Sequence, residues 1–268
     1  MTTSTREYVW PDPEILADLA LVRERAPLVH AVTNFVAAPL TANVLLAAGA
    51  VPAMVSAVEE VGAFAQVANA VLLNVGTVTT ESADVFRHAA KAAQEAGTPW
   101  VLDPVAVGAG LVLRDTVAAD ILAHAPTIIR GNASEILGLA GAAGGAKGPD
   151  STADSADALP LARDLARSTG AVVAVSGVVD YVTDGSTVYA VPGGHPLMTK
   201  VTGVGCSLGG LIAAYAGVVD DPLRAAASAS AVLAVAGSRA AETGTGARIG
   251  TGSFAVALLD QLSTLGLD

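Results

Sequence analysis

A glycine-rich loop that runs into a predicted helix is the part of this sequence best suited to phosphate chemistry. Thr202-Gly203-Val204-Gly205-Cys206 precedes a segment rich in Ala, Leu and Ile. Glycines let the backbone turn its amides toward a ligand, and a helix N-terminus adds a positive dipole there. Gly203 and Gly205 therefore predict an anion hole for a transferring phosphoryl group. A turn that merely begins a helix accounts for the same residues.

Cys206 is the only cysteine of the chain and lies at the expected start of that helix. This position is expected to lower the pKa of the thiol and favour the thiolate, which could accept the proton of a substrate hydroxyl. The alternative is a small side chain selected for tight packing. A single cysteine also excludes an intrachain disulfide, which fits a cytoplasmic protein.

Two carboxylates follow predicted strands and suit a cation. Asp103 ends the strand in Val-Leu-Asp103-Pro-Val, and Glu135 lies in Arg130-Gly-Asn132-Ala-Ser-Glu135. Asn132 and Glu135 have the spacing of a capping box, which is the structural explanation of Glu135. The functional explanation is that Asp103 and Glu135 hold Mg²⁺ through water molecules, since Mg²⁺ seldom needs more than two carboxylates.

Two other stretches imitate nucleotide-binding motifs. The segment from Gly141 to Gly148 resembles a Walker A loop, but Ala146 stands at the second conserved glycine and neither Ser nor Thr follows Lys147. The spacing Gly203-x-Gly205-x-x-x-Gly209 imitates a dinucleotide fingerprint, but loop-like residues precede it where a strand is required. Neither stretch satisfies its motif.

The elements that position these residues alternate between short apolar runs and alanine-rich segments of helical spacing. The predicted strands are Leu28–Thr33, Val51–Val55, Ala70–Val75, Trp100–Val105, Thr127–Arg130 and Ala171–Ser176, with a hairpin of Tyr181–Asp184 and Thr187–Val191. The predicted helices are Asp12–Arg25, Phe35–Ala48, Ala57–Asn69, Glu81–Ala96, Arg114–Ala123, Ala133–Leu139, Asp157–Ser168, Cys206–Val218, Pro222–Thr243 and Phe254–Leu262. This alternation predicts an α/β fold: a mostly parallel sheet with helices on both faces.

One domain spanning residues 1–268 fits this length and pattern. The Gly/Ala-rich stretch Gly138–Pro149 is interpreted as a surface loop, because strand–helix alternation resumes after it. Ligands of open α/β sheets bind beyond the carboxyl ends of the strands. Those ends carry Asn34, Met54, Asn74, Asp103, Arg130 and Ser176. Of the four histidines, His30 lies in an apolar strand and is expected to be a satisfied core residue.

Charge and hydrophobicity exclude several classes of function. Fourteen basic against 25 acidic residues give a net charge of −11, which repels nucleic acid and anionic lipid. Hydrophobic residues make up 52% of the chain, but the apolar runs are much shorter than the ~20 residues that span a bilayer. The first residues lack the apolar core of a secretory signal. We therefore expect no nucleic acid and no membrane among the partners.

Taken together and in order, the motifs resemble the hydroxyethylthiazole kinase family. The resemblance runs from about residue 13 to the C-terminus and rests on Pro27–Asn34, Thr41–Met54, Leu73–Thr77, Leu102–Val105, Ile129–Glu135, Thr199–Cys206 and Gly252–Phe254. It implies a ribokinase-like three-layer sandwich and a homotrimer with active sites between subunits. The implied reaction is ATP- and Mg²⁺-dependent phosphorylation of the hydroxyl of 5-(2-hydroxyethyl)-4-methylthiazole, a step in thiamine salvage.

The resemblance also implies roles for single residues. Met54 and Gly203 match positions that contact the thiazole, and Asn34 is expected beside it. Arg130 and Ser176 match ATP-binding positions, with Ser176 in place of the usual Thr. Asp103 and Glu135 match the Mg²⁺-associated positions. Cys206 stands where related enzymes carry an aspartate base.

Two departures from the family concern the acceptor site. Ala31 replaces an Asn found in many members, and Pro39 lies in an unusually apolar stretch at the start of a helix, where a first turn tolerates it. Other functions stay open at this point: hydroxymethylpyrimidine kinase, an ATP-dependent hydrate dehydratase, a non-catalytic nucleotide or thiamine-precursor binding protein, and a dinucleotide oxidoreductase.

Overall fold

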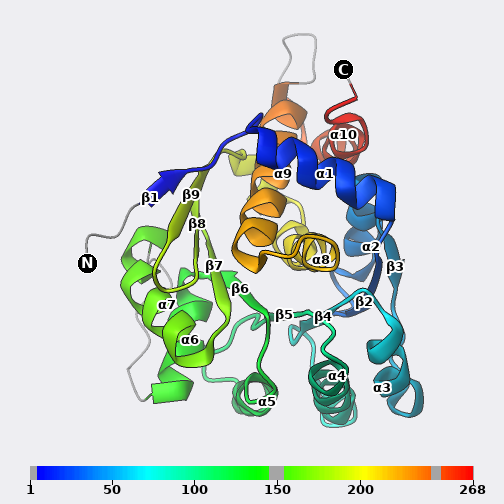
Figure 1. Ribbon diagram of the computed structural model, residues 1–268, viewed down its shortest axis with the longest axis vertical. Helices are drawn as coiled ribbons and strands as arrows, with labels where there is room; N and C mark the ends of the chain where they lie inside the picture. The colour runs from blue at the N-terminus through cyan, green and yellow to red at the C-terminus, as the bar shows by residue number, and fades with distance from the viewer. Residues whose placement is uncertain (1–4, 145–153, 243–248, 268) are drawn as a thin grey trace.

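One mixed sheet organises the computed structural model, which describes residues 5–144, 154–242 and 249–267. Across these residues the strand order is β1-β9-β8-β7-β6-β5-β4-β2-β3 (Figure 1). Every neighbouring pair from β3 to β7 is parallel, β8 runs antiparallel to both of its neighbours, and β1 pairs parallel with β9. The prediction of a mostly parallel sheet is therefore confirmed.

The strands are short, and the central ones are apolar on both faces. Their bounds are β1 Thr5–Glu7, β2 Leu28–Val32, β3 Val51–Ala53, β4 Ala70–Asn74, β5 Trp100–Asp103, β6 Ile128–Asn132, β7 Val172–Ser176, β8 Val179–Thr183 and β9 Val188–Pro192. All residues of β4 and β5 are buried. Continuous apolar runs of this kind are required where helices cover both faces of a parallel sheet.

Helices cover the sheet on both sides (Figure 1). One layer contains α1 Pro13–Arg25, α2 Ala38–Ala48, α8 Val204–Ala216, α9 Pro222–Glu242 and α10 Thr251–Thr264, and its side chains form one hydrophobic core with the sheet. The other contains α3 Val58–Val67, α4 Ala83–Ala96, α5 Val112–Leu122, α6 Ala133–Gly144 and α7 Ser155–Thr169, which form a second core. The predicted three-layer sandwich is confirmed. Within the described ranges, no helix is long and apolar enough to cross a membrane.

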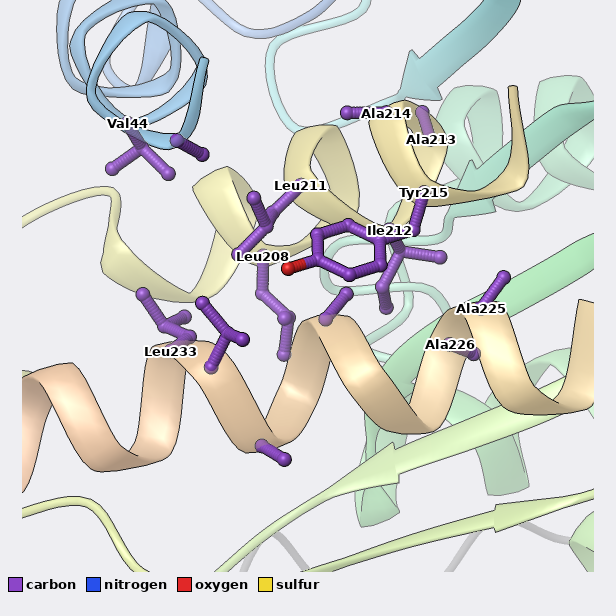
Figure 2. Packing of buried hydrophobic residues seen from close by; sticks show 14 of the residues in the cluster. Val44, Leu208, Leu211, Ile212, Ala213, Ala214, Tyr215, Ala225, Ala226 and Leu233 are labelled. Atoms are coloured by element: carbon purple, nitrogen blue, oxygen red, sulfur yellow. The ribbon is translucent and has the colours of Figure 1, made fainter. Parts of the chain in front are cut away.

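Helix α8 lies deep in the first layer, packed against α2, α9 and the strands β4 and β5. Figure 2 shows Leu208, Leu211 and Tyr215 of this helix facing its neighbours. Small residues permit the close approach: a Cβ on Gly209 would lie 3.0 Å from Leu72 Cδ1, and one on Gly210 would lie 2.9 Å from Thr41 Cγ2. The start of α8 is thereby held over the carboxyl end of the sheet, where the candidate site lies.

Some boundaries differ from the predictions for local reasons. Strand β1 was not predicted, because three polar residues carry no apolar signal and form a strand only by pairing with β9. Helix α2 begins at Ala38, not at Phe35, because Asn34 first makes a turn by accepting the Ala37 amide at 2.9 Å. The hairpin strands begin slightly away from the predicted bounds, at Val179 and Val188.

The interpretation of Gly138–Pro149 as a loop is wrong up to Gly144, where α6 ends. Gly138 is a packing position: a Cβ there would collide with the Val107 carbonyl oxygen. Helix α6 can therefore approach the turn after β5. The rest of that stretch, including Ala146 and Lys147 of the Walker-like segment, lies outside the described residues.

Candidate active site

The N-terminus of α8 and the carboxyl ends of the central strands form one polar region. Gly203 is the N-cap of α8 with a φ of +91°, a left-handed conformation that favours glycine. A Cβ on Gly203 would also lie 3.2 Å from Ala37 Cα. The glycine therefore meets two demands: it turns the chain into the helix and lets α2 approach. The first amides of α8 have no partner within the helix and suit an anion.

A chain of buried amide side chains connects three of the strand ends. Asn34 Nδ2 donates to Asn74 Oδ1 at 2.8 Å, and Asn74 Nδ2 donates to Asp103 Oδ2 at 2.7 Å. Asn34 Nδ2 also lies 3.4 Å from the sulfur of Cys206. The structure thus brings together Asn34, Cys206 and Asp103, which were predicted separately. Asn74 joins them; it was expected at a strand end where ligands bind but was assigned no role in the site.

Asp103 is fully buried at the centre of this region. Burial raises the pKa of its carboxyl group to about 7, whereas Arg130 favours the ionised form and the nearby charge of Glu135 opposes it. Arg130 Nη1 lies 3.8 Å from Asp103 Oδ2. Oδ1 has no hydrogen-bond partner among the described residues. An orphaned buried oxygen is suited to a water molecule or a hydrated cation.

Arg130 connects the carboxylate to the end of β7 and to the helix. Its Nε and Nη2 lie 3.2 and 2.9 Å from Ser176 Oγ, to which both donate. A Cβ on Gly205 would lie 3.4 Å from Nη2. The guanidinium group is therefore beside the first turn of α8, and it combines with the helix dipole and the Ser176 hydroxyl into a positively polarised corner.

Glu135 has the capping-box geometry that the sequence offered as its structural explanation. Its Oε2 accepts the Asn132 amide at 2.8 Å, and Asn132 Oδ1 accepts the Glu135 amide at 2.9 Å. Its Oε1 accepts the Ala106 amide at 3.0 Å. Both carboxylate oxygens are therefore engaged, so Glu135 could act on a hydrated cation through its charge.

The residues present fit a Mg²⁺ ion held mainly by other oxygens. Within the described ranges, no three His, Cys, Asp or Glu side chains gather into a metal-binding group. Asp103 offers the free buried oxygen Oδ1. A magnesium ion keeps several waters and binds phosphate oxygens together with one or two carboxylates, and this set of side chains satisfies that requirement.

The pKa of Cys206 is raised, which corrects the expectation of a lowered value. Burial is the main cause, and the negative charge of Asp103 adds to it, whereas Asn74, Asn34 and Arg130 act in the opposite direction. The helix begins at Val204, so Cys206 lies within the first turn, half-buried above the carboxylate. Its resting form at neutral pH is therefore the thiol.

A cavity of about 650 Å³ adjoins the positively polarised corner. Arg130, Ser176 and Gly205 line one part of it. Its other lining residues include Asp180 of β8 and Ser230 of α9, which were not predicted as site residues. In the sequence, Asp180 lies between two predicted strands and Ser230 lies in an alanine-rich predicted helix, so neither carried a signal.

Met54 lies outside the lining of this cavity, as does Asn34. Met54 follows the edge strand β3 and is 37% exposed. His30 holds the neighbouring backbone, with its Nε2 lying 3.0 Å from the Val55 carbonyl oxygen. His30 is buried as expected but not fully satisfied, since its Nδ1 lacks a partner among the described residues.

The three-layer sandwich is a ribokinase-like fold. A ribokinase-like superfamily protein from Enterococcus faecalis superposes with a TM-score of 0.60 over 88% of this chain and 86% of that one, at 12% identity. The chain belongs to the hydroxyethylthiazole kinase family, whose model matches residues 19–268.

Individual relatives agree with this membership. The chain is 57% identical to the hydroxyethylthiazole kinase of Leptospira interrogans over 263 residues, which cover 98% of this chain and 97% of the relative. A solved hydroxyethylthiazole kinase from Pyrococcus horikoshii is 39% identical and superposes with a TM-score of 0.85, covering 94% of this chain and 93% of that one. The family expected from the sequence motifs is confirmed.

Proposed function

We propose that this protein transfers the γ-phosphoryl group of ATP to the hydroxyl of 5-(2-hydroxyethyl)-4-methylthiazole, giving the thiazole phosphate used for thiamine. The observation that carries the proposal is the corner formed by Arg130, Ser176 and Gly205 beside the buried Asp103, in a chain of this family. It combines an anion site, a carboxylate suited to Mg²⁺ and a thiol within one polar network.

The phosphates of ATP are assigned to the α8 end of the cavity. Arg130 and Ser176 line it there, and the amides from Gly203 to Cys206 point out of a helix N-terminus. These groups stabilise negative charge that grows on the phosphoryl oxygens during transfer. Asp103 would hold Mg²⁺ through water, with Glu135 adding negative charge, and the ion would supply neutralisation of part of the phosphate charge.

The acceptor is assigned to the side of the network that faces Asn34. Asn34, Met54 and Gly203 would surround the thiazole, and its hydroxyl would approach the sulfur of Cys206. Because Cys206 rests as a thiol, positioning and charge stabilisation must supply most of the rate. Proton acceptance requires the thiolate, so Cys206 would act as the base only in the fraction of the enzyme whose thiol has already released its proton to solvent.

We further propose a cytoplasmic homotrimer of single-domain subunits, with each acceptor site completed by a neighbouring subunit. Large apolar side chains are exposed at or near α2, β3 and α3: Phe35, Val36, Leu46, Val51, Met54, Val58 and Val67. Of these, Phe35, Val36, Met54 and Val58 lie toward the carboxyl ends of β2 and β3, on the acceptor side of the network. Phe35 and Val67 are 76% and 71% exposed. Surfaces of this kind mark protein interfaces, and Met54 belongs to both the surface and the proposed acceptor site.

Product formation tests the reaction directly. Purified protein is mixed with Mg-ATP and the thiazole alcohol, and the phosphate ester is followed by mass spectrometry; the alcohol omitted in a parallel sample is the control. Steady ester formation is the expected result. If ATP binds without ester formation, hydroxymethylpyrimidine and other small alcohols become the acceptors to test, and a binding protein without turnover remains if all of them fail.

Cys206→Ala tests the proton acceptor, with Cys206→Ser as the matched variant that keeps a polar group. We expect kcat to fall by about 10²-fold or more for alanine, the range typical of positioned acid–base groups, while KM for ATP changes little. An unchanged kcat would remove the sulfur from the reaction and leave the anion site in place.

Sedimentation of Phe35→Glu, expected to be monomeric and inactive, tests the assembly.

A further inference from the structure

The cavity beside Arg130 has three chemically different zones that follow the order of the strands. Ser176 pairs with Asn132 at the end of β7. Val175 pairs with Tyr181, so Asp180 comes opposite Ser176, and Asp180 pairs with Val191 of β9. Ser176, Asp180 and Val191 all line the cavity. Because neighbouring strands are about 4.8 Å apart, they form a row roughly 10 Å long.

The first zone suits phosphates, and the last suits a flat apolar ring. Arg130, Ser176 and the start of α8 form the positive end. Away from that end, Val191 of β9 and Leu233 and Ala234 of α9 present apolar surface. Ser230, one turn before Ala234 in α9, also lines the cavity, and its hydroxyl is buried and without a hydrogen-bond partner among the described residues. A base with one polar edge fits that combination.

Asp180 occupies the zone between them. Its Oδ1 accepts the Gly177 amide at 2.9 Å, and no described residue donates to its Oδ2. Burial raises its pKa to about 6, with the Gly177 amide and Arg130 acting in the opposite direction, so the carboxylate is mostly ionised at pH 7.5. A carboxylate cannot face phosphate without repulsion, and it accepts hydrogen bonds from hydroxyl groups.

Resting on the proposed use of ATP, we propose that Asp180 selects ribonucleotides by accepting hydrogen bonds from the 2′- or 3′-hydroxyl of the ribose. In a bound nucleoside triphosphate the sugar connects the phosphates to the base. The row Ser176–Asp180–Val191 has the same order. Asp180 is thus a specificity-determining residue that takes no part in phosphoryl transfer.

The test compares ATP, 2′-deoxy-ATP and 3′-deoxy-ATP with the wild-type protein and with Asp180→Ala. A hydrogen bond to a charged group changes affinity by about ten- to a hundredfold. With the wild-type protein, we expect kcat/KM for at least one deoxynucleotide to be lower than that for ATP by this factor. With Asp180→Ala, kcat/KM for ATP should fall by the same factor, and the kcat/KM values for the three nucleotides should agree within about twofold. Ser230→Ala, a control variant changed in the base zone, should keep the preference for ATP over the deoxynucleotides.

The outcomes separate this inference from the proposed function. Nucleotide binding is measured in parallel by calorimetry without acceptor. If the wild type binds and uses all three nucleotides equally well, the ribose assignment is overturned and the kinase function stands. If Asp180→Ala keeps the deoxynucleotide preference and instead loses the preference for ATP over ITP, the carboxylate reads the base, which also overturns the assignment. If no nucleotide binds, both are overturned.

Discussion

Replacing Asn74 with alanine removes the side chain that joins the two halves of the candidate active site. Asn74 is fully buried at the end of β4. It donates to Asp103 at 2.7 Å and accepts from Asn34 and from the Gly76 amide at 2.8 and 3.1 Å. In the variant, the buried Asp103 carboxylate, the buried Asn34 amide and the half-buried Gly76 amide all lose a partner.

The expected loss of stability follows from those three groups. A buried donor or acceptor left without a partner costs ~1–3 kcal/mol, and the carboxylate of Asp103 lies at the upper end of that range. Water entering the vacated space offsets part of the cost. We therefore expect the free energy of unfolding to fall by about 3 kcal/mol. This is a large share of the ~5–15 kcal/mol that stabilises a typical domain.

Asn69→Ala is the matched control, because Asn69 flanks the opposite end of the same strand. It is exposed, and its Oδ1 accepts only the Leu28 amide, at 2.8 Å. We expect this variant to lose about 1 kcal/mol or less. Urea unfolding at one fixed protein concentration, followed by fluorescence of the buried Trp100 in neighbouring β5, measures both.

Activity provides a second readout of the same change. Asn34 and Asp103 lose their common partner, so the acceptor and the metal-binding carboxylate are no longer held together. A misplacement of ~1 Å costs about 10²-fold in rate, and we expect kcat of Asn74→Ala to fall by that order. The reasoning is refuted if Asn74→Ala matches Asn69→Ala within about 0.5 kcal/mol and retains full kcat.

Three further predictions concern single side chains. Arg130→Lys should lower kcat/KM for ATP by about tenfold or more, because an ammonium group cannot reproduce the planar contacts with Ser176. Arg163→Lys is the control, since Arg163 donates to carbonyl groups of the β8–β9 turn. Steady-state kinetics should show no such loss for this control. The raised pKa of Cys206 should make its alkylation by iodoacetamide at pH 8 slower than that of a free thiol by an order of magnitude; faster labelling, measured by intact mass, would contradict the assigned environment. Burial lowers the pKa of His30, so the unfolded chain binds the proton more readily than the folded chain. This contribution to stability is therefore present above about pH 6.5 and lost as the pH falls. In urea unfolding, the free energy of unfolding of His30→Gln should decline less between pH 7 and 5 than that of the wild type, and an identical decline would exclude His30 as its source.

Local patterns along the chain were sufficient to predict the layers of the fold and most of the strand ends. The apolar runs from β2 to β7 could be recognised because strands covered on both faces must be apolar throughout. Asn132 and Glu135 carried a local signal, since a capping box depends on a spacing of three residues. Family membership was readable because several motifs occurred in one order along most of the chain.

How these residues act on one another depends on contacts that form only in the folded chain. Strand β1 exists because β9 pairs with it, and α6 continues past Gly138 because a glycine there lets the helix approach the turn after β5. The pKa of Cys206 is governed by burial and by Asp103, which lies a hundred residues away in sequence. Asp180 gains its place in the cavity from strand register. Burial, charge and register arise from contacts between distant segments, and no local pattern encodes them.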